Sequence, residues 1–301
     1  MKEVEFRWKR ERPEDFIVKE ISDFPRDESG PHYLYLLAKK NLTTKEVCSP
    51  LGLSYAGMKD KLAITFQKVS SPKFLGDFLK EERKGGWFAL KFLYKVRKKV
   101  KVGQLKGNRF AVNLKGLKVK EREWFINYYD VQRILGLEGN YRRGRELLFQ
   151  MVASKKVKRR LSWTQNFLID SYLSYLWNES FALYLKERFG GYLVREREAT
   201  FFIPEAPLDE IKELPKFWPL LGYKKKLSVA ESYYGQLLEK EGFSLESFLN
   251  LLKKLGIKGD YRKTYLLIEP PKKVGDYFFF TLPKGAFATM YLKHLVTGGD
   301  L

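Results

Sequence analysis

The stretch Ser54–Gln67, SYAGMKDKLAITFQ, contains a short charged turn between two apolar runs. These runs, Leu51–Ala56 and Leu62–Val69, have the composition of strands. Gly57 permits the bend between them, because glycine adopts backbone conformations that other residues avoid. The stretch therefore predicts two strands joined by a turn that presents polar side chains.

The tripeptide Lys59-Asp60-Lys61 sets one carboxylate between two cations within this turn. Neighbouring positive charge and donated hydrogen bonds keep an aspartate ionised, as a carboxylate nucleophile or base requires. A solvated turn with a surface ion pair would have the same composition, and on charge alone it is the more common arrangement. The wider sequence has to decide between the two interpretations.

Length and charge limit the classes of protein to consider. The chain has 301 residues, of which 44% are hydrophobic and 16% aromatic, enough for a substantial core and two domains. Its formal net charge is +21. Such an excess predicts a polyanionic partner, most simply nucleic acid, because bound phosphates release their counterions. An anionic membrane is the competing partner, but no apolar run approaches the roughly 18 residues of a spanning helix.

Cysteine and histidine are scarce. Cys48 stands alone, so we expect neither a disulfide framework nor a thiolate metal site, and His32 and His294 are too few for a histidine-based zinc centre. The N-terminal residues MKEVEFRWKR lack the apolar core of a signal peptide. We therefore expect a reduced, cytoplasmic location and no bound metal.

Several segments have clear local signals in the first third of the chain. Strands are predicted over Phe16–Ile21 and His32–Lys40. Thr43 and Glu46 form a capping box for a helix that ends near Ser49. The segment Phe74–Arg83 is predicted as a short amphipathic helix, closed by two glycines.

Lys95–Arg122 is the main electrostatic feature, with eleven Lys and Arg residues against the single acid Glu121. The cations alternate with apolar residues, which predicts a β-hairpin with an apolar inner face and a cationic outer face. Such a face suits an RNA backbone. Residues 142–160 add eight more cations to the basic surface: Arg142, Arg143, Arg145, Lys155, Lys156, Lys158, Arg159 and Arg160.

The second half of the chain is predicted to combine helices with loops and short strands. A long helix spans Gln165–Arg188, and a shorter one spans Ser244–Leu255. Four prolines break residues 200–235 into loops and short strands. The C-terminal region predicts a strand over Tyr277–Leu282, a turn, and a helix that ends near Leu295.

The string GMKDKLAITFQ resembles the motif G-x-K-D-[KR]-x-A-x-T-x-Q, which surrounds the nucleophilic aspartate of the TruD family of tRNA pseudouridine synthases. Three further strings resemble motifs of that family in the same order along the chain. They are PEDFIVKE at 13–20, LKGNRFAVNL at 105–114 and FTLPKGAFAT at 280–289. The resemblance thus covers landmarks through most of the chain.

The family's inserted domain opens with N-Y-F-G-x-Q-R-F-G, which residues 127–135 match only in part. Asn127, Tyr128, Gln132 and Arg133 agree, whereas Asp130, Ile134 and Leu135 replace Gly, Phe and Gly. The resemblance implies an α+β fold. A pseudouridine synthase catalytic domain, with a mixed, largely antiparallel sheet and flanking helices, would comprise residues 1–125 and 257–301, and an α/β TRUD domain would be inserted over 126–256.

The resemblance also assigns roles to individual residues. Asp60 would be the catalytic nucleophile, and Lys59, Lys61 and Arg10 are the candidate cations that would keep it charged. The residues placed at the target nucleotide are Phe16, Asn108, Phe110 and Phe287. The basic run, rather than the resemblance, predicts contacts with the RNA backbone from Lys98, Lys99, Lys101 and Arg109.

The activity implied is isomerisation of a uridine, uridine-13 of tRNA, to pseudouridine after the base has been flipped from its stack. This chemistry needs no cofactor, and we expect a monomer whose partner is tRNA, without a membrane or a protein partner. A non-catalytic RNA-binding protein or RNA chaperone on the same scaffold would explain the charge equally well. A Mg²⁺-dependent nuclease would require at least one more acid beside Asp60.

Overall fold

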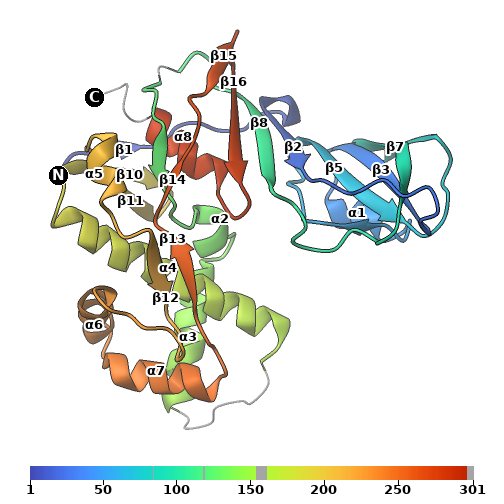
Figure 1. Ribbon diagram of the computed structural model, residues 1–301. Coiled ribbons are helices and arrows are strands. Elements are labelled where there is room, and N and C mark those ends of the chain that lie inside the picture. The colour runs from blue at the N-terminus through green and yellow to red at the C-terminus, as the bar shows by residue number, and fades with distance from the viewer. Residues whose placement is uncertain (84, 118, 154–160, 297–301) are drawn as a thin grey trace. The chain divides into compact units, whose positions relative to one another are not determined.

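The computed structural model describes residues 1–83, 85–117, 119–153 and 161–296, which form two compact units (Figure 1). The sheet unit comprises Trp8–Glu121 and Ile268–Ala288. The helical unit comprises Met1–Arg7, Arg122–Leu267 and the segment that begins at Thr289. Each unit is therefore assembled from segments that are distant in the sequence.

These boundaries differ from the predicted division at 125/126 and 256/257. The N-terminal β1 (Glu3–Glu5) pairs in parallel with β10 (Gly191–Glu196), which attaches it to the helical unit. Similarly, β14 (Tyr265–Leu267) pairs with β9 (Trp124–Ile126). The strand pairing therefore joins the N-terminal segment and the segment around β14 to the middle of the chain.

The sheet unit is built on one mixed sheet in the order β15-β16-β8-β2-β5-β3-β7-β6, with β4 paired to β5. The pair β2 and β5 is parallel and the other neighbours are antiparallel, which confirms the predicted α+β class with a largely antiparallel sheet. The elements are η1 (Pro13–Asp15), β2 (Phe16–Ile21), β3 (His32–Lys40), α1 (Thr44–Cys48), β4 (Ser54–Tyr55), β5 (Ile64–Ser71), β6 (Phe78–Arg83), β7 (Gly86–Val96), β8 (Gly107–Asn113), β15 (Lys272–Val274) and β16 (Tyr277–Pro283).

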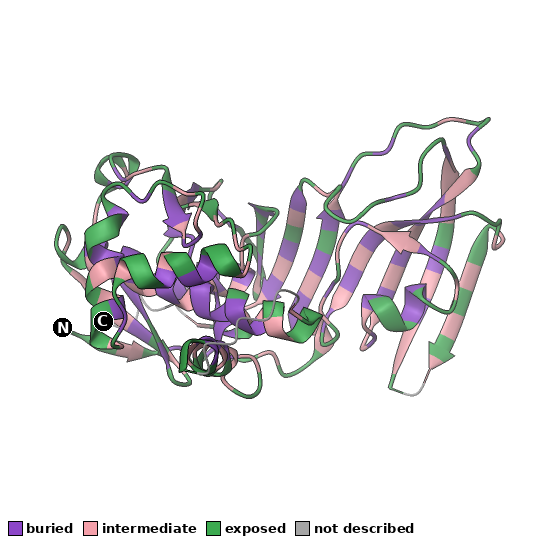
Figure 2. Cartoon of the chain, turned by 90° about the horizontal axis from the view of Figure 1, so that it is seen from below, coloured by how far each residue is buried: buried purple, intermediate pink, exposed green. Residues whose placement is uncertain are grey.

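Local signals predicted several of these elements correctly. The strands β2 and β3 have their predicted bounds, and Figure 2 shows buried and exposed residues alternating along strands, as period-two patterning requires. The capping box at the start of α1 is also confirmed, because the Thr43 hydroxyl accepts a hydrogen bond from the Glu46 amide. Of the two runs that flank the Asp60 turn, the second forms β5 and the first contributes only the short β4.

The helix predicted over Phe74–Arg83 is wrong. Residues Phe78–Arg83 form the edge strand β6, which pairs antiparallel with the first half of β7. Gly85, with φ of +85°, lies in the tight connection between the two strands, where its left-handed backbone favours glycine. Pairing with β7 gives the backbone of these residues hydrogen-bond partners in a neighbouring strand. These tertiary contacts override the weak helical pattern of the segment.

The β-hairpin predicted within Lys95–Arg122 is also wrong. β7 ends at Val96 and pairs with β3 and β6, whereas β8 begins at Gly107 and pairs with β2 and β16. Alternation correctly indicated extended chain, but alternation does not specify which strand lies beside which. The intervening residues form an irregular connection.

The helical unit is centred on α4 (Trp163–Lys186), the long helix predicted from the sequence. The predicted helices α7 (Leu245–Lys254) and α8 (Ala288–Val296) are present, whereas α6 (Ala230–Lys240) lies in a region predicted to be loop. That helix begins after the last of the four prolines, where the chain is free to become helical. The remaining elements are α2 (Val131–Ile134), α3 (Asn140–Ala153), β11 (Ala199–Pro204), α5 (Leu208–Lys212), β12 (Phe217–Leu220) and β13 (Asp260–Lys263).

The second basic stretch is only partly described. Arg142, Arg143 and Arg145 lie on α3, and each forms an ion pair with a glutamate. Five of its cations lie outside the described residues: Lys155, Lys156, Lys158, Arg159 and Arg160.

A buried ionic cluster ties α8 to α2 within the helical unit. The Lys293 ammonium lies 2.6 Å from the Asp130 carboxylate and 2.5 Å from that of Glu196, and both Lys293 and Asp130 have fully buried side chains. Asp130 also accepts a hydrogen bond from the Val131 amide at the start of α2. The residue that departs from the glycine of the TruD motif therefore has a specific partner near the C-terminus.

Replacing Lys293 by Met should lower the free energy of unfolding by about 3–5 kcal/mol, because it leaves buried carboxylates without their cation. Urea denaturation of the full chain would measure the change. The double variant Lys293→Met/Asp130→Asn should recover part of the loss, since one buried charge is removed with its partner. A loss below about 1 kcal/mol in Lys293→Met would contradict the assignment.

Candidate active site

One face of the sheet carries a row of side chains that extends across five strands. The strand register places Phe280, Phe110, Val18, Thr65 and Lys39 opposite one another, from β16 to β3. Directly opposed residues in neighbouring strands point to the same face, so these five side chains share it. The row passes from aromatic residues at one end to a lysine at the other.

The next row on this face is more polar. Asn108 of β8 lies opposite Glu20 of β2 and Leu282 of β16. The Glu20 carboxylate is buried, accepts a hydrogen bond from Ser22, and forms an ion pair with Lys59 at 2.8 Å. Through Lys59, the turn that contains Asp60 is attached to this face of the sheet.

Buried hydrogen bonds fix the backbone of the turn. The Gln67 amide donates to the Gly57 carbonyl at 3.0 Å, and its oxygen accepts from the Thr44 hydroxyl at 2.9 Å. The same hydroxyl accepts a hydrogen bond from the Lys59 amide at 2.9 Å. Since Thr44 and Gln67 are buried, this chain of bonds is shielded from water and holds the turn in one conformation.

Lys39 holds the peptide of Asp60 in place through hydrogen bonds. Sequence reasoning did not assign this residue to the site. Its fully buried side chain donates hydrogen bonds to the carbonyl oxygens of Asp60, at 2.9 Å, and Lys59, at 3.3 Å. Burial lowers the pKa of Lys39 to about 8, although attraction by Asp60 opposes that shift. A lysine at an inward position of an apolar strand was the available sequence signal.

Asp60 forms its ion pair with Arg10. The Arg10 guanidinium lies 3.3 Å from the Asp60 carboxylate and also donates to the Leu62 carbonyl. It stacks over the Phe16 ring, 4.1 Å from the ring centroid, which fixes its position further. The Asp60 side chain remains 42% exposed, whereas that of Arg10 is only 14% exposed. The carboxylate is therefore charge-paired and still open to a ligand.

The two lysines beside Asp60 in sequence have other partners. Lys59 points inward to Glu20, and Lys61 lies 3.3 Å from the carboxylate of Glu46 on the surface. Among the described residues, the structure thus brings Arg10, fifty residues away, to Asp60 as the ion-pair partner.

Aromatic rings pack beside this charged turn. Phe16 and Phe110 have ring centroids 5.6 Å apart, and Phe110 stacks on Phe280 at 5.2 Å. All three rings are buried, and their contacts make one continuous apolar surface, which we call the aromatic floor. Phe280 was predicted as part of a strand, but its contact with Phe110 depends on the pairing of β8 with β16. Phe287 follows β16 and is half-buried.

Asn108 contributes an unused hydrogen-bond acceptor. Its side chain is half-buried, and its Oδ1 atom is buried without a hydrogen-bond partner in the described part of the chain. An unsatisfied buried amide oxygen is costly in a stable protein. It therefore marks a position where a ligand could supply the missing donor.

The cations predicted to contact RNA lie at two places. Lys98, Lys99 and Lys101 are exposed on the irregular connection between β7 and β8. Arg109 is exposed on β8, between Asn108 and Phe110. Because successive side chains of a strand alternate, Arg109 projects from the opposite face of the sheet.

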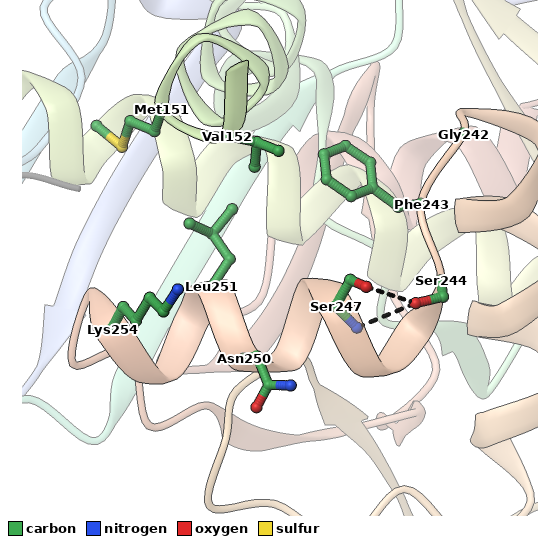
Figure 3. Close-up of a pocket in the computed structure, with 9 residues that line it drawn as sticks. All are labelled: Met151, Val152, Gly242, Phe243, Ser244, Ser247, Asn250, Leu251 and Lys254. Carbon is green, nitrogen blue, oxygen red and sulfur yellow. Dashed lines mark hydrogen bonds between the residues drawn. The ribbon is translucent and has the colours of Figure 1, made fainter. Parts of the chain in front are cut away.

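The described residues outside this site offer one sizeable pocket and no alternative metal centre. No group of three or more His, Cys, Asp or Glu side chains within those residues is arranged to hold a metal ion. A pocket of about 510 Å³ lies in the helical unit between α3 and α7, where Phe243, Leu251 and Val152 line it (Figure 3). None of the predicted site residues lines this pocket. Among the helices that are described, none combines the length and apolar character required to cross a bilayer.

Comparison with known proteins identifies the family. A sequence profile for tRNA pseudouridine synthase D (TruD) matches residues 9–136. The chain is 33% identical over 231 aligned positions to tRNA pseudouridine synthase D of Wolinella succinogenes, covering 68% of this chain and 61% of that relative. It is 25% identical to the Nitratiruptor sp. protein of the same name over 97% of this chain and 95% of that one.

A solved structure shows the same fold. The crystal structure of a TruD protein from Methanosarcina mazei superposes with a TM-score of 0.59 at 19% identity, covering 96% of this chain and 93% of that chain. The sequence matches establish that the chain belongs to the TruD family of tRNA pseudouridine synthases, which are isomerases.

Proposed function

We propose that this protein isomerises a uridine of tRNA to pseudouridine, with Asp60 as the carboxylate nucleophile. The observation that carries the proposal is the state of Asp60. Its side chain is 42% exposed, and its carboxylate lies 3.3 Å from the Arg10 guanidinium, on a turn held by buried hydrogen bonds. A fixed, ionised and accessible carboxylate is what nucleophilic catalysis requires.

The proposed reaction conserves every atom of the substrate. The Asp60 carboxylate attacks the nucleoside or promotes cleavage of the bond between N1 and C1′, and the freed uracil rotates within the site. A new bond forms between C5 and C1′, C5 loses its proton, and N1 gains one. No electron acceptor or phosphate donor is consumed, so the proposal includes no cofactor.

The aromatic floor and Asn108 would receive the flipped base. A uridine removed from its stack loses contacts with its neighbours, and apolar or aromatic side chains compensate for that loss. Phe16, Phe110 and Phe287 are assigned to this role. The free Oδ1 atom of Asn108 would accept a hydrogen bond from the uracil N3–H or the ribose hydroxyl.

We further propose that the substrate position is uridine-13 of tRNA, that the protein acts as a monomer, and that it acts in the cytoplasm. The names of the relatives support tRNA as the substrate class. The target position rests on the resemblance of the motif strings to the family.

The test is to map pseudouridine by nucleotide in an unmodified tRNA transcript incubated with the protein, with and without EDTA. The proposal expects modification at one position, unaffected by EDTA. Activity that disappears in EDTA would instead favour a metal-dependent reaction. Tight, salt-sensitive binding without modification of any tested RNA would favour the non-catalytic RNA-binding protein.

Neutralising the exposed connection before β8 should weaken the electrostatic part of RNA binding. The variant Lys98→Gln/Lys99→Gln/Lys101→Gln should reduce the slope of log Kd against log salt concentration by about 2, because each phosphate contact contributes about 0.7–0.9. Filter binding at several salt concentrations measures this slope. An unchanged slope would mean that the RNA follows a path that avoids this connection.

A further inference from the structure

The helical unit contains a small β-ribbon whose outer face is aromatic and basic. β12 and β13 pair antiparallel, with Phe217 opposite Lys263 and Trp218 opposite Arg262 (Figure 1). Trp218 is buried, whereas Phe217 is 50% exposed and Tyr261, two positions from Lys263, is 44% exposed. Because side chains alternate along a strand, Phe217, Tyr261 and Lys263 lie on one outer face.

Two loops place further lysines beside this face. The Tyr223 amide donates to the Ile257 carbonyl at 3.1 Å, and the Lys224 amide donates to the Lys258 carbonyl at 3.2 Å. A Cβ atom on Gly222 would lie 2.0 Å from the Gly259 nitrogen, so the two loops approach too closely for any larger residue there. The backbone positions of these lysines are therefore set by direct contact between the loops.

Tyr261 connects the loops to the ribbon. Its hydroxyl donates to the Lys226 carbonyl at 3.1 Å, and the Lys225 ammonium lies 5.1 Å from the centroid of its ring. We call these residues the lysine–tyrosine surface. It comprises Phe217, Tyr223, Lys224, Lys225, Lys226, Lys258, Tyr261 and Lys263.

The charge of this region is strongly one-sided. Residues 216–226 contain four lysines and no acid, and residues 253–263 contain five cations against Asp260. Within the described chain, none of the five lysines of the surface forms an ion pair with a carboxylate, in contrast to Arg142, Arg143 and Arg195 of the same unit. Clustered lysines repel one another unless an anion joins them, so this arrangement favours a polyanionic ligand.

The aromatic residues indicate which kind of polyanion fits this surface. A phosphate backbone alone would need only the lysines, whereas unpaired bases stack on exposed aromatic rings. Phe217 and Tyr261 offer such rings beside the cations, and the hydrogen bond to Lys226 restrains the Tyr261 side chain. An acidic protein or a lipid surface would gain less from this combination.

We propose that the lysine–tyrosine surface binds unpaired nucleotides of the RNA substrate, outside the Asp60 site. The inference rests on the proposed function for the identity of that RNA. The lysines contact phosphates, and Tyr261 and Phe217 stack on bases. The helical unit thereby contributes affinity for the substrate while the sheet unit carries the reacting groups.

Lysine footprinting tests the surface in the unmodified protein. Acetylation by acetic anhydride, measured by mass spectrometry, should fall at least about threefold at Lys224, Lys226 and Lys258 when tRNA is bound. The exposed Lys212 and Lys240 serve as internal controls and should keep their reactivity. Equal protection of both sets, or protection of the surface by anionic phosphatidylserine vesicles but not by tRNA, would overturn the proposal.

Variants provide the second measurement. Lys224→Gln/Lys226→Gln/Lys258→Gln should weaken tRNA binding at least about tenfold at 0.1 M salt and lower the salt slope by about 2. Lys2→Gln/Lys212→Gln/Lys240→Gln removes the same charge from exposed positions elsewhere in the helical unit and should behave as wild type. Turnover at saturating tRNA should be unchanged in both.

Substitutions of Tyr261 distinguish the contribution of base stacking to tRNA affinity from that of charge. Tyr261→Ala should weaken binding about 5- to 100-fold, whereas Tyr261→Phe, which retains the ring, should change it less than about threefold. The proposal would be overturned if the Lys224→Gln/Lys226→Gln/Lys258→Gln variant and the Tyr261→Ala variant both bound tRNA as tightly as the control variant. If tRNA binds through this surface but no pseudouridine forms, the proposed function fails and the surface stands.

Discussion

Replacing Asp60 by Asn should reduce pseudouridine formation by about 10⁴-fold or more, because an amide of the same shape cannot act as the nucleophile. Affinity for tRNA should change less than about threefold, since the turn is held by its backbone and by Lys59, Thr44 and Gln67 rather than by the carboxylate. Single-turnover assays with excess enzyme would measure the chemical step apart from binding.

The matched control for this variant is Asp77→Asn, which makes the same chemical change at an exposed position of the sheet unit. It should keep wild-type turnover. An Asp60→Asn protein that retains more than a tenth of wild-type turnover would remove Asp60 from the role of nucleophile, whatever its affinity for tRNA.

Replacing Lys39 by Met should lower kcat by about 10²-fold or more, with little change in KM. The loss follows because Lys39 holds the peptide of Asp60 rather than the substrate, and a misplacement of about 1 Å can cost this much. Lys39→Arg should not restore activity, because Lys39 is fully buried and a guanidinium is larger than the ammonium that it would replace. A rise in KM at constant kcat would instead place Lys39 in substrate binding.

The pH dependence separates this positioning role from a purely structural one. The pKa of Lys39 is about 8 in the folded protein, below the value of about 10.4 for an exposed lysine. The ammonium therefore loses its proton as pH rises through 8, and wild-type turnover should fall over that range. Between about 8 and 10.4 the unfolded chain binds more protons, so the contribution of Lys39 to stability rises with pH.

Activity and the Lys39 contribution to stability should thus change in opposite directions above pH 8. Two of its neighbours do not contribute to that change, because burial raises the pKa of Cys48 to about 12 and hydrogen bonds from Thr43 lower that of Glu46 to about 2. The residual activity of Lys39→Met should lack the alkaline decline. A decline of the same shape in that variant would assign it to another group.

Local sequence was sufficient where the physical cause is local. The strand β2, the strand β3 and the cap of α1 were predicted with their bounds, because hydrophobic alternation and a four-residue capping box act between near neighbours. The motif around Asp60 likewise identified the family, and with it the turn that we propose to be reactive. These features need no knowledge of what lies elsewhere in the chain.

Long-range features were beyond the same reasoning. Two lysines flank Asp60 in sequence, yet their partners are Glu20 and Glu46, and the charge beside Asp60 comes from Arg10. The cation that pairs with Asp60 is decided by side-chain direction and by strand pairing. The parallel pairing of β2 with β5 brings the segment before β2, which contains Arg10, to the turn before β5.

The features predicted from the sequence and those decided by the tertiary structure therefore differ in how far apart in the sequence the interacting residues lie. The sequence by itself determined the family and the local elements, and it pointed to the Asp60 turn as the candidate site, since motif, backbone preference and periodicity act over a few residues. Only the tertiary structure decided that β8 pairs with β2 and β16, that Lys39 lies under Asp60, and that distant lysines meet at Tyr261. The order of strands depends on the packing of the whole sheet, which no short segment specifies.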